Sequence, residues 1–184
     1  MVGGSGAGGR MRRWWLAAGV LAWLRATGAG PARAADAATP AEVVAQVRAA
    51  AALLAEQGEA GLALMQDRDG RFVFKDSYVF ASDCGSRTLL AHPIQPERNG
   101  QPIAAGPAYG GVTAAERAEA QCAVGTRPGG GWYAYPFPKP GATEPARKVS
   151  YLLPVPGTSW IVGAGVHDET DTIEALTRIS DAAP

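Results

Sequence analysis

The sequence predicts an α+β domain, in which helices pack on a central antiparallel sheet. Three observations indicate this class. A helical pattern of apolar residues begins after Thr39, short β-rich runs separated by glycine and proline follow it, and a second helical pattern closes the chain over 170–179. Short successive strands pair through turns, and the apolar face of each helix must be buried against them. One domain is the expectation for 184 residues.

The first helix has clear start and stop signals. Thr39 suits the N-cap, Pro40 suits the first turn, and Glu42 completes a capping box. Gly58 ends the helix. Between these signals, apolar residues recur at helical spacing: Val43, Val44, Val47, Ala50, Ala51 and Leu54. A shorter helix is predicted directly afterwards, over 59–66.

The stretch 78–93 carries the clearest hairpin signal. Two short β-rich runs flank a polar tip that contains Asp and Gly. Period-two alternation predicts that Tyr78 and Phe80 share one face, and that Leu90 and His92 share a face on the second strand. A titratable histidine is therefore expected at the end of an apolar strand, where a sheet commonly opens onto a loop or pocket.

A long loop and a helix are predicted next. Residues 95–111 are rich in proline and glycine, and loops of this length in compact domains are usually functional or mobile. A helix over 113–124 follows, with Glu116, Arg117 and Glu119 expected on its exposed side.

Three further strands precede the closing helix, and they are predicted over 132–137, 147–153 and 159–166. In the last of them, Gly163 and Gly165 fall on one face and leave space beside the sheet. That space would admit either a ligand or a closely packed helix, and the sequence leaves both alternatives open.

The first 35 residues have the pattern of a secretory signal peptide. A basic stretch is followed by an apolar segment, 14–24, and then by the small-x-small site Ala32-Arg33-Ala34. Cleavage is expected at this site, with an uncleaved anchor as the alternative, and translation starts at either Met1 or Met11. The mature chain is accordingly expected to be periplasmic or secreted.

The mature domain, 36–184, is acidic. The leader contains no acidic residue and five of the 17 basic ones, which leaves 12 basic and 17 acidic residues and a net charge of −5. The leader's basic residues are Arg10, Arg12, Arg13, Arg25 and Arg33. This charge argues against nucleic acid as a partner, and no membrane span is predicted in the mature chain.

Two cysteines, Cys84 and Cys122, remain in the mature chain. Export permits a disulfide between them, and a pair of free thiols is the alternative. Neither Cys-x-x-Cys nor Cys-x-x-Cys-His is present, so neither a thiol redox centre nor a c-type haem is indicated.

The sequence supplies little for catalysis. It contains two histidines, His92 and His167, and no arrangement that suggests a nucleophile elbow. Asp168 beside His167 falls short of the three or four ligands that zinc requires. We therefore predict no enzyme activity, no catalytic residues, no metal and no cofactor.

Four segments together resemble the single Cache domains, of the sCache_2 type, found in bacterial extracytoplasmic sensors. They are the hairpin that closes on Leu-Ala-His-Pro, then 131–135 (Gly-Trp-Tyr-Ala-Tyr), 147–151 (Arg-Lys-Val-Ser-Tyr) and 160–166 (Trp-Ile-Val-Gly-Ala-Gly-Val). The resemblance covers roughly Pro40 to His167. It implies a PAS-like central sheet behind a long N-terminal helix, with a ligand held between the sheet and its covering loops. His167 departs from the pattern, since the family commonly has tyrosine there.

A small-molecule pocket is expected on the aromatic strands, because rings with polar tips give such pockets shape and orientation. The resemblance favours Lys148 as the cation for a carboxylate, with His92 and Tyr151 as orienting hydrogen-bonding groups. Alternation places Lys148 and Tyr151 on opposite faces unless a bulge intervenes, and Arg147 is expected in solvent. The full set of predicted ligand-binding residues is Tyr78, His92, Trp132, Tyr135, Lys148 and Tyr151.

Two functions are compatible with these features. The first is an exported sensor-type binding domain for a small molecule, most simply a short organic acid, that passes the bound state to a membrane receptor or a transport partner. The second is a structural or accessory periplasmic protein with a Cache-like fold and no metabolite ligand.

Overall fold

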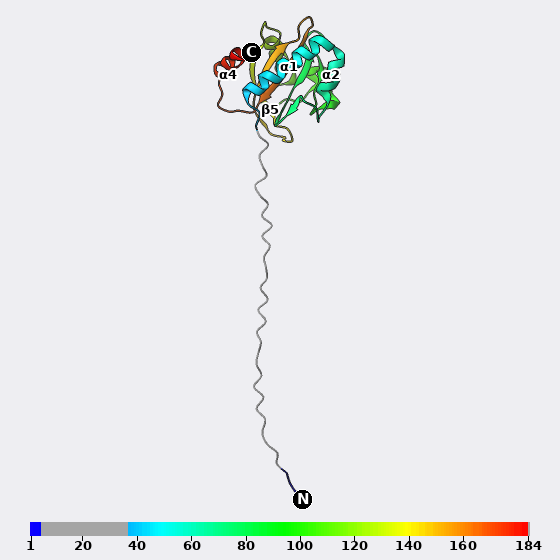
Figure 1. Cartoon of the computed structure of the whole chain (residues 1–184), viewed down its shortest axis with the longest axis vertical. Coiled ribbons are helices and arrows are strands. Elements are labelled where there is room, and N and C mark those ends of the chain that lie inside the picture. Colours follow the sequence, from blue (N-terminus) through cyan, green and yellow to red (C-terminus); the bar gives the residue numbers. More distant parts are fainter. Residues whose placement is uncertain (5–36, 184) are drawn as a thin grey trace. The chain divides into compact units, whose positions relative to one another are not determined.

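The computed structural model of the chain describes residues 1–4 and 37–183 (Figure 1). The predicted signal peptide and its cleavage site lie almost wholly outside the described residues. The chain divides into two units, and its described helices and strands all belong to the second, Arg33–Pro184. No helix within the described ranges is long and apolar enough to cross a membrane.

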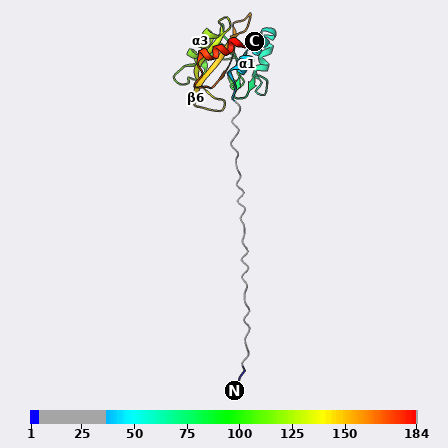
Figure 2. The ribbon, with the colours of Figure 1, turned by 60° about the vertical axis from the view of Figure 1, so that its left-hand side comes forward.

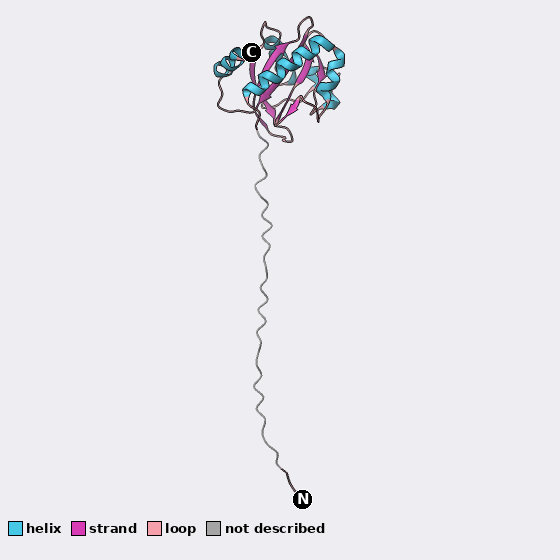
Figure 3. Cartoon of the chain, viewed as in Figure 1, coloured by secondary structure: helices cyan, strands magenta, loops and turns pink. Residues whose placement is uncertain are grey.

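A five-stranded antiparallel sheet forms the centre of the domain (Figure 3). Its strands run in the order β4-β3-β7-β6-β5, so the two edges are β4 and β5. The strands are β3 (Phe80–Asp83), β4 (Thr88–Ala91), β5 (Gly131–Pro138), β6 (Pro145–Pro154) and β7 (Trp160–Val166). A separate hairpin precedes them, made of β1 (Val73–Phe74) and β2 (Ser77–Tyr78). The α+β class with a central antiparallel sheet is therefore confirmed.

Helices cover both faces of the sheet. Their bounds are α1 (Pro40–Gln57), α2 (Glu59–Gln66), α3 (Ala114–Gly125) and α4 (Ile173–Ala182). The buried face of α1 packs with apolar residues of β6 and β7 in the main core, and Leu176 of α4 joins that core. Helix α4, red in Figures 1 and 2, contacts both α1 and the edge strand β5. Helix α3 contributes Cys122 to a second apolar cluster, which contains Leu152 and Ile161.

Capping boxes form at the N-termini of α1 and α3. Thr39 accepts from the backbone of Glu42, whose carboxylate accepts from the backbone of Thr39, and Thr113 and Glu116 repeat the arrangement at α3. The observed bounds of α2 match the predicted ones. The long loop between β4 and α3 holds two short 3₁₀ turns, η1 (Pro96–Arg98) and η2 (Ile103–Ala105), and η2 contacts α3.

A β-bulge interrupts the pairing of β3 with β4. Ser82 pairs with Leu89, whereas the neighbouring Ala81 pairs with Ala91. Leu90 is consequently an extra residue with no partner on β3.

The bulge reverses the alternation of side chains along β4. Leu89 and His92 face one side of the sheet, while Leu90 and Ala91 pack with the main core on the other. The expectation that Leu90 and His92 share a face is wrong, because one inserted residue shifts every later side chain to the opposite face.

The short β1–β2 hairpin holds the start of α1. Its turn consists of Lys75 and Asp76, and Lys75 adopts φ 52°. Lys75 Nζ lies 2.8 Å from a carboxylate oxygen of Glu42, and Asp76 Oδ1 accepts a hydrogen bond of 2.7 Å from the backbone N–H of Ala38. Tyr78, at the other end of the hairpin, is buried beneath the sheet's second face.

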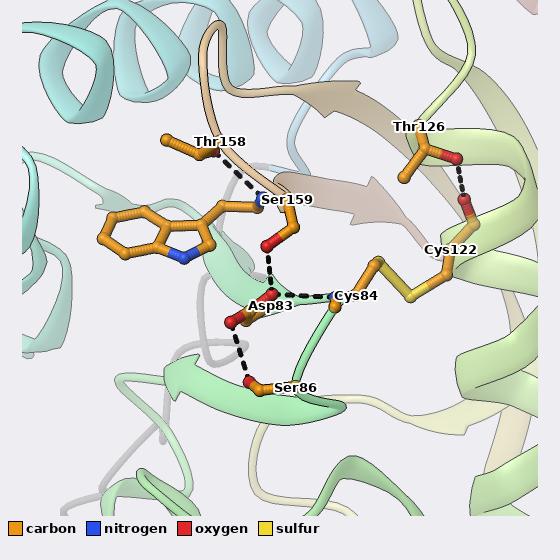
Figure 4. Close-up of a disulfide and its surroundings, with 9 residues drawn as sticks. Asp83, Cys84, Ser86, Cys122, Thr126, Thr158 and Ser159 are labelled. Carbon is orange, nitrogen blue, oxygen red and sulfur yellow. Dashed lines mark hydrogen bonds between the residues drawn. A yellow bond between two sulfur atoms is a disulfide. The ribbon is translucent and has the colours of Figure 1, made fainter.

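A disulfide joins Cys84, directly after β3, to Cys122 on α3 (Figure 4). Of the two alternatives left open by the sequence, the structure thus has the bonded pair. Next to it, Asp83 accepts hydrogen bonds from the hydroxyls of Ser86 and Ser159, which order the hairpin tip. The disulfide therefore fixes α3 against the end of the β3–β4 hairpin.

The space beside Gly163 and Gly165 is filled by side chains of neighbouring strands. A Cβ atom at Gly163 would lie 2.6 Å from Leu152 and 2.7 Å from Phe80, and one at Gly165 would overlap Ser150. Neither a ligand nor a helix occupies that space, because cross-strand neighbours already do.

Candidate ligand site

A small cavity lies on the face of the sheet that points away from α1. Its volume is about 40 Å³. Strand residues form its floor, and α3 and the β4–α3 loop cover it. The lining residues are Tyr78, Phe80, Ser82, Leu89, His92, Arg98, Ile103, Arg117, Gln121, Tyr135, Phe137 and Lys148.

Lys148 is the most deeply buried charged group of the cavity. Its side chain is 2% exposed, and its Nζ lies 4.3 Å from the centre of the Tyr78 ring and 5.2 Å from that of Phe137. Among the described residues it has no hydrogen bond and no ion pair. Burial lowers the pKa of Lys148 to about 7, and the charge of Asp76 opposes that change only in part.

Two arginines approach the same cavity from outside the sheet. Arg117 comes from α3, is 5% exposed, and donates from Nη2 to the carbonyl of Pro107 at 3.3 Å. Its Nη1 is buried and finds no acceptor in the described part of the chain. Arg98 comes from η1 and donates to the carbonyl of Ile103. Arg117 was expected on an exposed helix face, and that expectation is wrong because the α3–η2 contact buries it.

The cavity wall carries positive charge without a compensating acid. Lys148, Arg98 and Arg117 line it, and none of its lining residues is aspartate or glutamate. Buried charges require a partner or their desolvation is costly. A cluster of this kind is thus electrostatically suited to a small anion.

His92 faces the cavity as a neutral ring. Its Nδ1 accepts a hydrogen bond of 3.0 Å from the backbone N–H of Gln95, which assigns the ring proton to Nε2. Burial, followed by the charges of Lys148 and Arg98, lowers the pKa of His92 to about 3. The imidazole therefore offers one N–H donor at neutral pH and no charge.

The two tyrosines of the cavity differ in their hydrogen bonds. The hydroxyl of Tyr135 lies 3.0 Å from the hydroxyl of Ser150, on the same face of β6 as Lys148. Tyr78 packs its ring against His92, with ring centres 4.8 Å apart. Burial raises the pKa of both phenols, so both hydroxyls stay neutral donors.

Trp132 and Tyr151 are not brought to the cavity. Both pack in the main core beneath α1, with ring centres 5.3 Å apart, and the Tyr151 hydroxyl donates to the carbonyl of Gly129. Strand β6 pairs regularly on both sides, so Tyr151 stays on the face opposite to Lys148. The prediction that Trp132 and Tyr151 line the ligand site is therefore corrected. A bulge in β6 would have been needed to bring Tyr151 to the face of Lys148, and the bulge lies in β4 instead.

Two other residues considered from the sequence lie outside the cavity. Arg147 is partly buried and donates to the carbonyls of Asp168 and Asp171, in the loop after β7. His167 follows β7, one step beyond the Val149–Val166 pair, and both its ring nitrogens are buried without a partner in the described residues. Burial, with the charge of Lys148 next, lowers the pKa of His167 to about 4.

A second cavity of about 140 Å³ adjoins the first, which is called the inner cavity below. The two share Tyr78, His92 and Phe137, and the outer one is otherwise lined by Tyr109, residues 94–95 and residues 138–142.

Comparison with known proteins agrees with the architecture. The family model for the Cache domain, dCache_2, matches residues 63–171, more than half of the chain. The methyl-accepting chemotaxis protein McpP of Pseudomonas putida (strain KT2440) is 29% identical over 108 residues. That alignment covers 59% of this chain but 19% of McpP, so the chain spans about a fifth of that relative's length.

Two solved structures have a similar fold. One is described as the periplasmic sensor domain of a chemotaxis protein, with 25% identity, a TM-score of 0.56, and coverage of 71% of this chain and 95% of that one. The other comes from work described as the structural basis for carboxylic acid recognition by a Cache chemosensory domain. It is 24% identical, with a TM-score of 0.54 and coverage of 70% of this chain and 92% of that one.

Proposed function

Since this chain belongs to the Cache domain family, we propose that it is an extracytoplasmic sensor domain that binds a short organic acid in its inner cavity. The family and its relation to chemotaxis receptor domains come from the matched residues 63–171 and from the P. putida relative. The ligand class is argued from the cavity itself.

One observation supports an anionic ligand above all. Three basic side chains converge on a small cavity whose lining contains no acid. A carboxylate placed between Lys148 and Arg117 would neutralise one buried charge and give the unpaired Nη1 of Arg117 an acceptor. Water cannot serve the same purpose, because it brings no charge.

The size of the cavity favours a short acid. One water molecule needs about 10–15 Å³ of such space, so about 40 Å³ accommodates a few water-sized groups. Sugars and nucleotides are far larger. The apolar lining from Phe80, Leu89 and Ile103 suits a short hydrocarbon end.

The polar lining residues then provide either charge or hydrogen bonds. Lys148 and Arg117 provide charge, and Arg117 also provides a planar pair of N–H donors. His92 donates from Nε2, and the hydroxyls of Tyr78 and Tyr135 orient the carboxylate further. Trp132 and Tyr151 have no role in binding, since they pack on the other face of the sheet.

Export and a signalling partner complete the proposal. The leader pattern favours release of residues 36–184 into the periplasm, and the relationship to chemotaxis receptors favours a membrane receptor or a transport partner as the recipient of the bound state. A structural protein with this fold and no metabolite ligand remains the competing function, and it predicts no saturable ligand.

A ligand screen on the mature domain distinguishes the two functions. Acetate, propionate, pyruvate and lactate should raise the unfolding temperature in a saturable way, because a ligand that binds only the native state stabilises it. Amino acids and sugars serve as controls of similar solubility. If none of the acids shifts the unfolding temperature, the structural alternative stands.

Substitution of the cations tests the site itself. Lys148→Ala and Arg117→Ala should each reduce the binding free energy by about 2–5 kcal/mol, as expected for one half of a buried charge pair. Arg178→Ala, on the exposed side of α4, is the matched control and should bind as the wild type does. Calorimetric titration measures all three. Unchanged affinity in both cavity variants would place the ligand elsewhere.

A further inference from the structure

We propose that the acid is bound together with one proton, which the amine of Lys148 takes from solvent as the carboxylate enters the cavity. The inference rests on the proposed function. It adds that ligand binding depends on both the concentration of the acid and the pH of the surroundings.

The geometry of the empty cavity makes a full set of charges costly. Lys148 is enclosed between the rings of Tyr78 and Phe137, and it shares the cavity with Arg98 and Arg117. Burial is the main reason, since it disfavours the charged form of the amine, and repulsion between like charges in a poorly screening medium acts in the same direction. A guanidinium holds its proton in proteins, whereas a buried ammonium releases its proton readily. Lys148 is therefore the group that loses its proton.

The groups that face Lys148 from other elements do not offset this repulsion. Tyr78, Tyr135, His92 and His167 are neutral around pH 7, since burial raises the pKa of the phenols and lowers that of the imidazoles. Asp76 is the one acid among the described groups whose charge raises the pKa of Lys148, and its carboxylate already binds the N–H of Ala38. Burial therefore outweighs the charge of Asp76, and the pKa of Lys148 is about 7.

Binding of a carboxylate reverses the balance. Its negative charge, placed beside Lys148, raises the pKa of the lysine, as any close opposite charge does. Above pH 7 the bound state then holds one proton more than the free domain and free carboxylate together. The one bond formed is the third N–H bond of the ammonium, whose proton comes from solvent: a neutral amine, a carboxylate anion and one proton become an ammonium–carboxylate pair.

The consequence is a defined pH dependence of affinity. Below about pH 7 the lysine is already protonated and the dissociation constant should stay nearly constant. Above it, the dissociation constant should rise by about tenfold per pH unit, the slope for one proton taken up. A permanently charged cation in the same place would give no such slope.

Calorimetry of the wild-type mature domain tests the inference directly. Acetate and propionate are titrated at pH 6.0, 7.0, 8.0 and 9.0 and constant ionic strength, at each pH in two zwitterionic or cationic buffers that hold that pH and differ in ionisation enthalpy. We expect about one proton taken up per bound acid at pH 8 and above, and nearly none at pH 6. The dissociation constant should rise about tenfold between pH 8.0 and 9.0.

Lys148→Arg is the matched variant, because arginine keeps the charge and removes the titration. If it binds either acid, its proton uptake should be close to zero at every pH. Equal wild-type dissociation constants from pH 6.0 to 9.0, with no difference between buffers, would overturn the inference and leave the proposed function intact. If neither acid binds at any pH, the proposed function itself falls, and this inference with it.

Discussion

The two faces of the sheet use the same strands for different purposes. On β5 and β6, the side chains of Trp132, Val149 and Tyr151 pack against α1 in an apolar core, while the alternating Tyr135 and Lys148 line a polar cavity. Buried basic side chains that the structure describes occur only on the cavity side: His92, Arg117 and Lys148. Neighbouring residues in sequence can therefore be altered separately, one for stability and the next for binding.

This separation has an energetic basis. Apolar burial on the α1 side stabilises the fold in proportion to the area removed from water. The cavity side holds desolvated cations, and replacing such groups by apolar ones is often neutral or stabilising. We therefore expect substitutions on the α1 side to affect mainly stability, and substitutions on the cavity side to affect mainly binding. Three experiments test the contrast.

The largest expected effect is on the packed face. Trp132→Ala should lower the free energy of unfolding by about 3–5 kcal/mol, the range for removing a buried aromatic side chain. Affinity for the acid should change little in the fraction that stays folded, because Trp132 does not line the cavity. Urea unfolding and calorimetry measure the two quantities. Leu64→Ala, at a residue 48% exposed, should cost less than about 0.5 kcal/mol.

Removal of the disulfide should affect both quantities. The bond joins residues 38 apart in sequence, and a double Cys84→Ser, Cys122→Ser variant should lose roughly 2–4 kcal/mol of stability. Affinity should fall too, because α3 carries Arg117 and Gln121 to the cavity and the disulfide holds α3 in place. Wild-type protein treated with a reductant is the parallel sample. A loss of stability with unchanged affinity would show that the other contacts of α3 suffice to position it.

The smallest effect is a loss of stability in acid that originates on the cavity face. His92 has a pKa of about 3 in the folded domain and about 6.5 when unfolded. The unfolded chain therefore binds more protons between these values, so stability falls as pH drops below 6.5. At pH 5 the cost from His92 is about 2 kcal/mol. His92→Gln should remove that share of the slope in urea unfolding at pH 5 and 7, and an unchanged slope would mean that His92 is not buried as a neutral ring.

Local patterns in the sequence predict much of the fold and part of the site. The capping box of α1, the bounds of α2 and the hairpin at 78–93 all depend on residues that are close together in sequence, so the sequence alone predicts them. Regular alternation on β6 likewise predicts Lys148 and Tyr151 on opposite faces, and they lie on opposite faces in the structure.

The remainder depends on contacts between distant segments. The orientation of His92 comes from the bulge at Leu90, and a pattern of period two contains no sign of an inserted residue. Arg117 stands between two exposed glutamates, so its own helix suggests solvent, and only docking of α3 on η2 buries it. Arg98 reaches the cavity from a loop whose path no periodicity describes.

The β1–β2 hairpin contacts both the inner cavity and the start of α1. At one end of the hairpin, Tyr78 forms part of the wall of the inner cavity. At the other end, Asp76 accepts a hydrogen bond from Ala38 and Lys75 forms an ion pair with Glu42, at the start of α1. Its two strands pair directly with each other. A substitution of Tyr78 is therefore expected to affect both the cavity and the N-terminal end of α1.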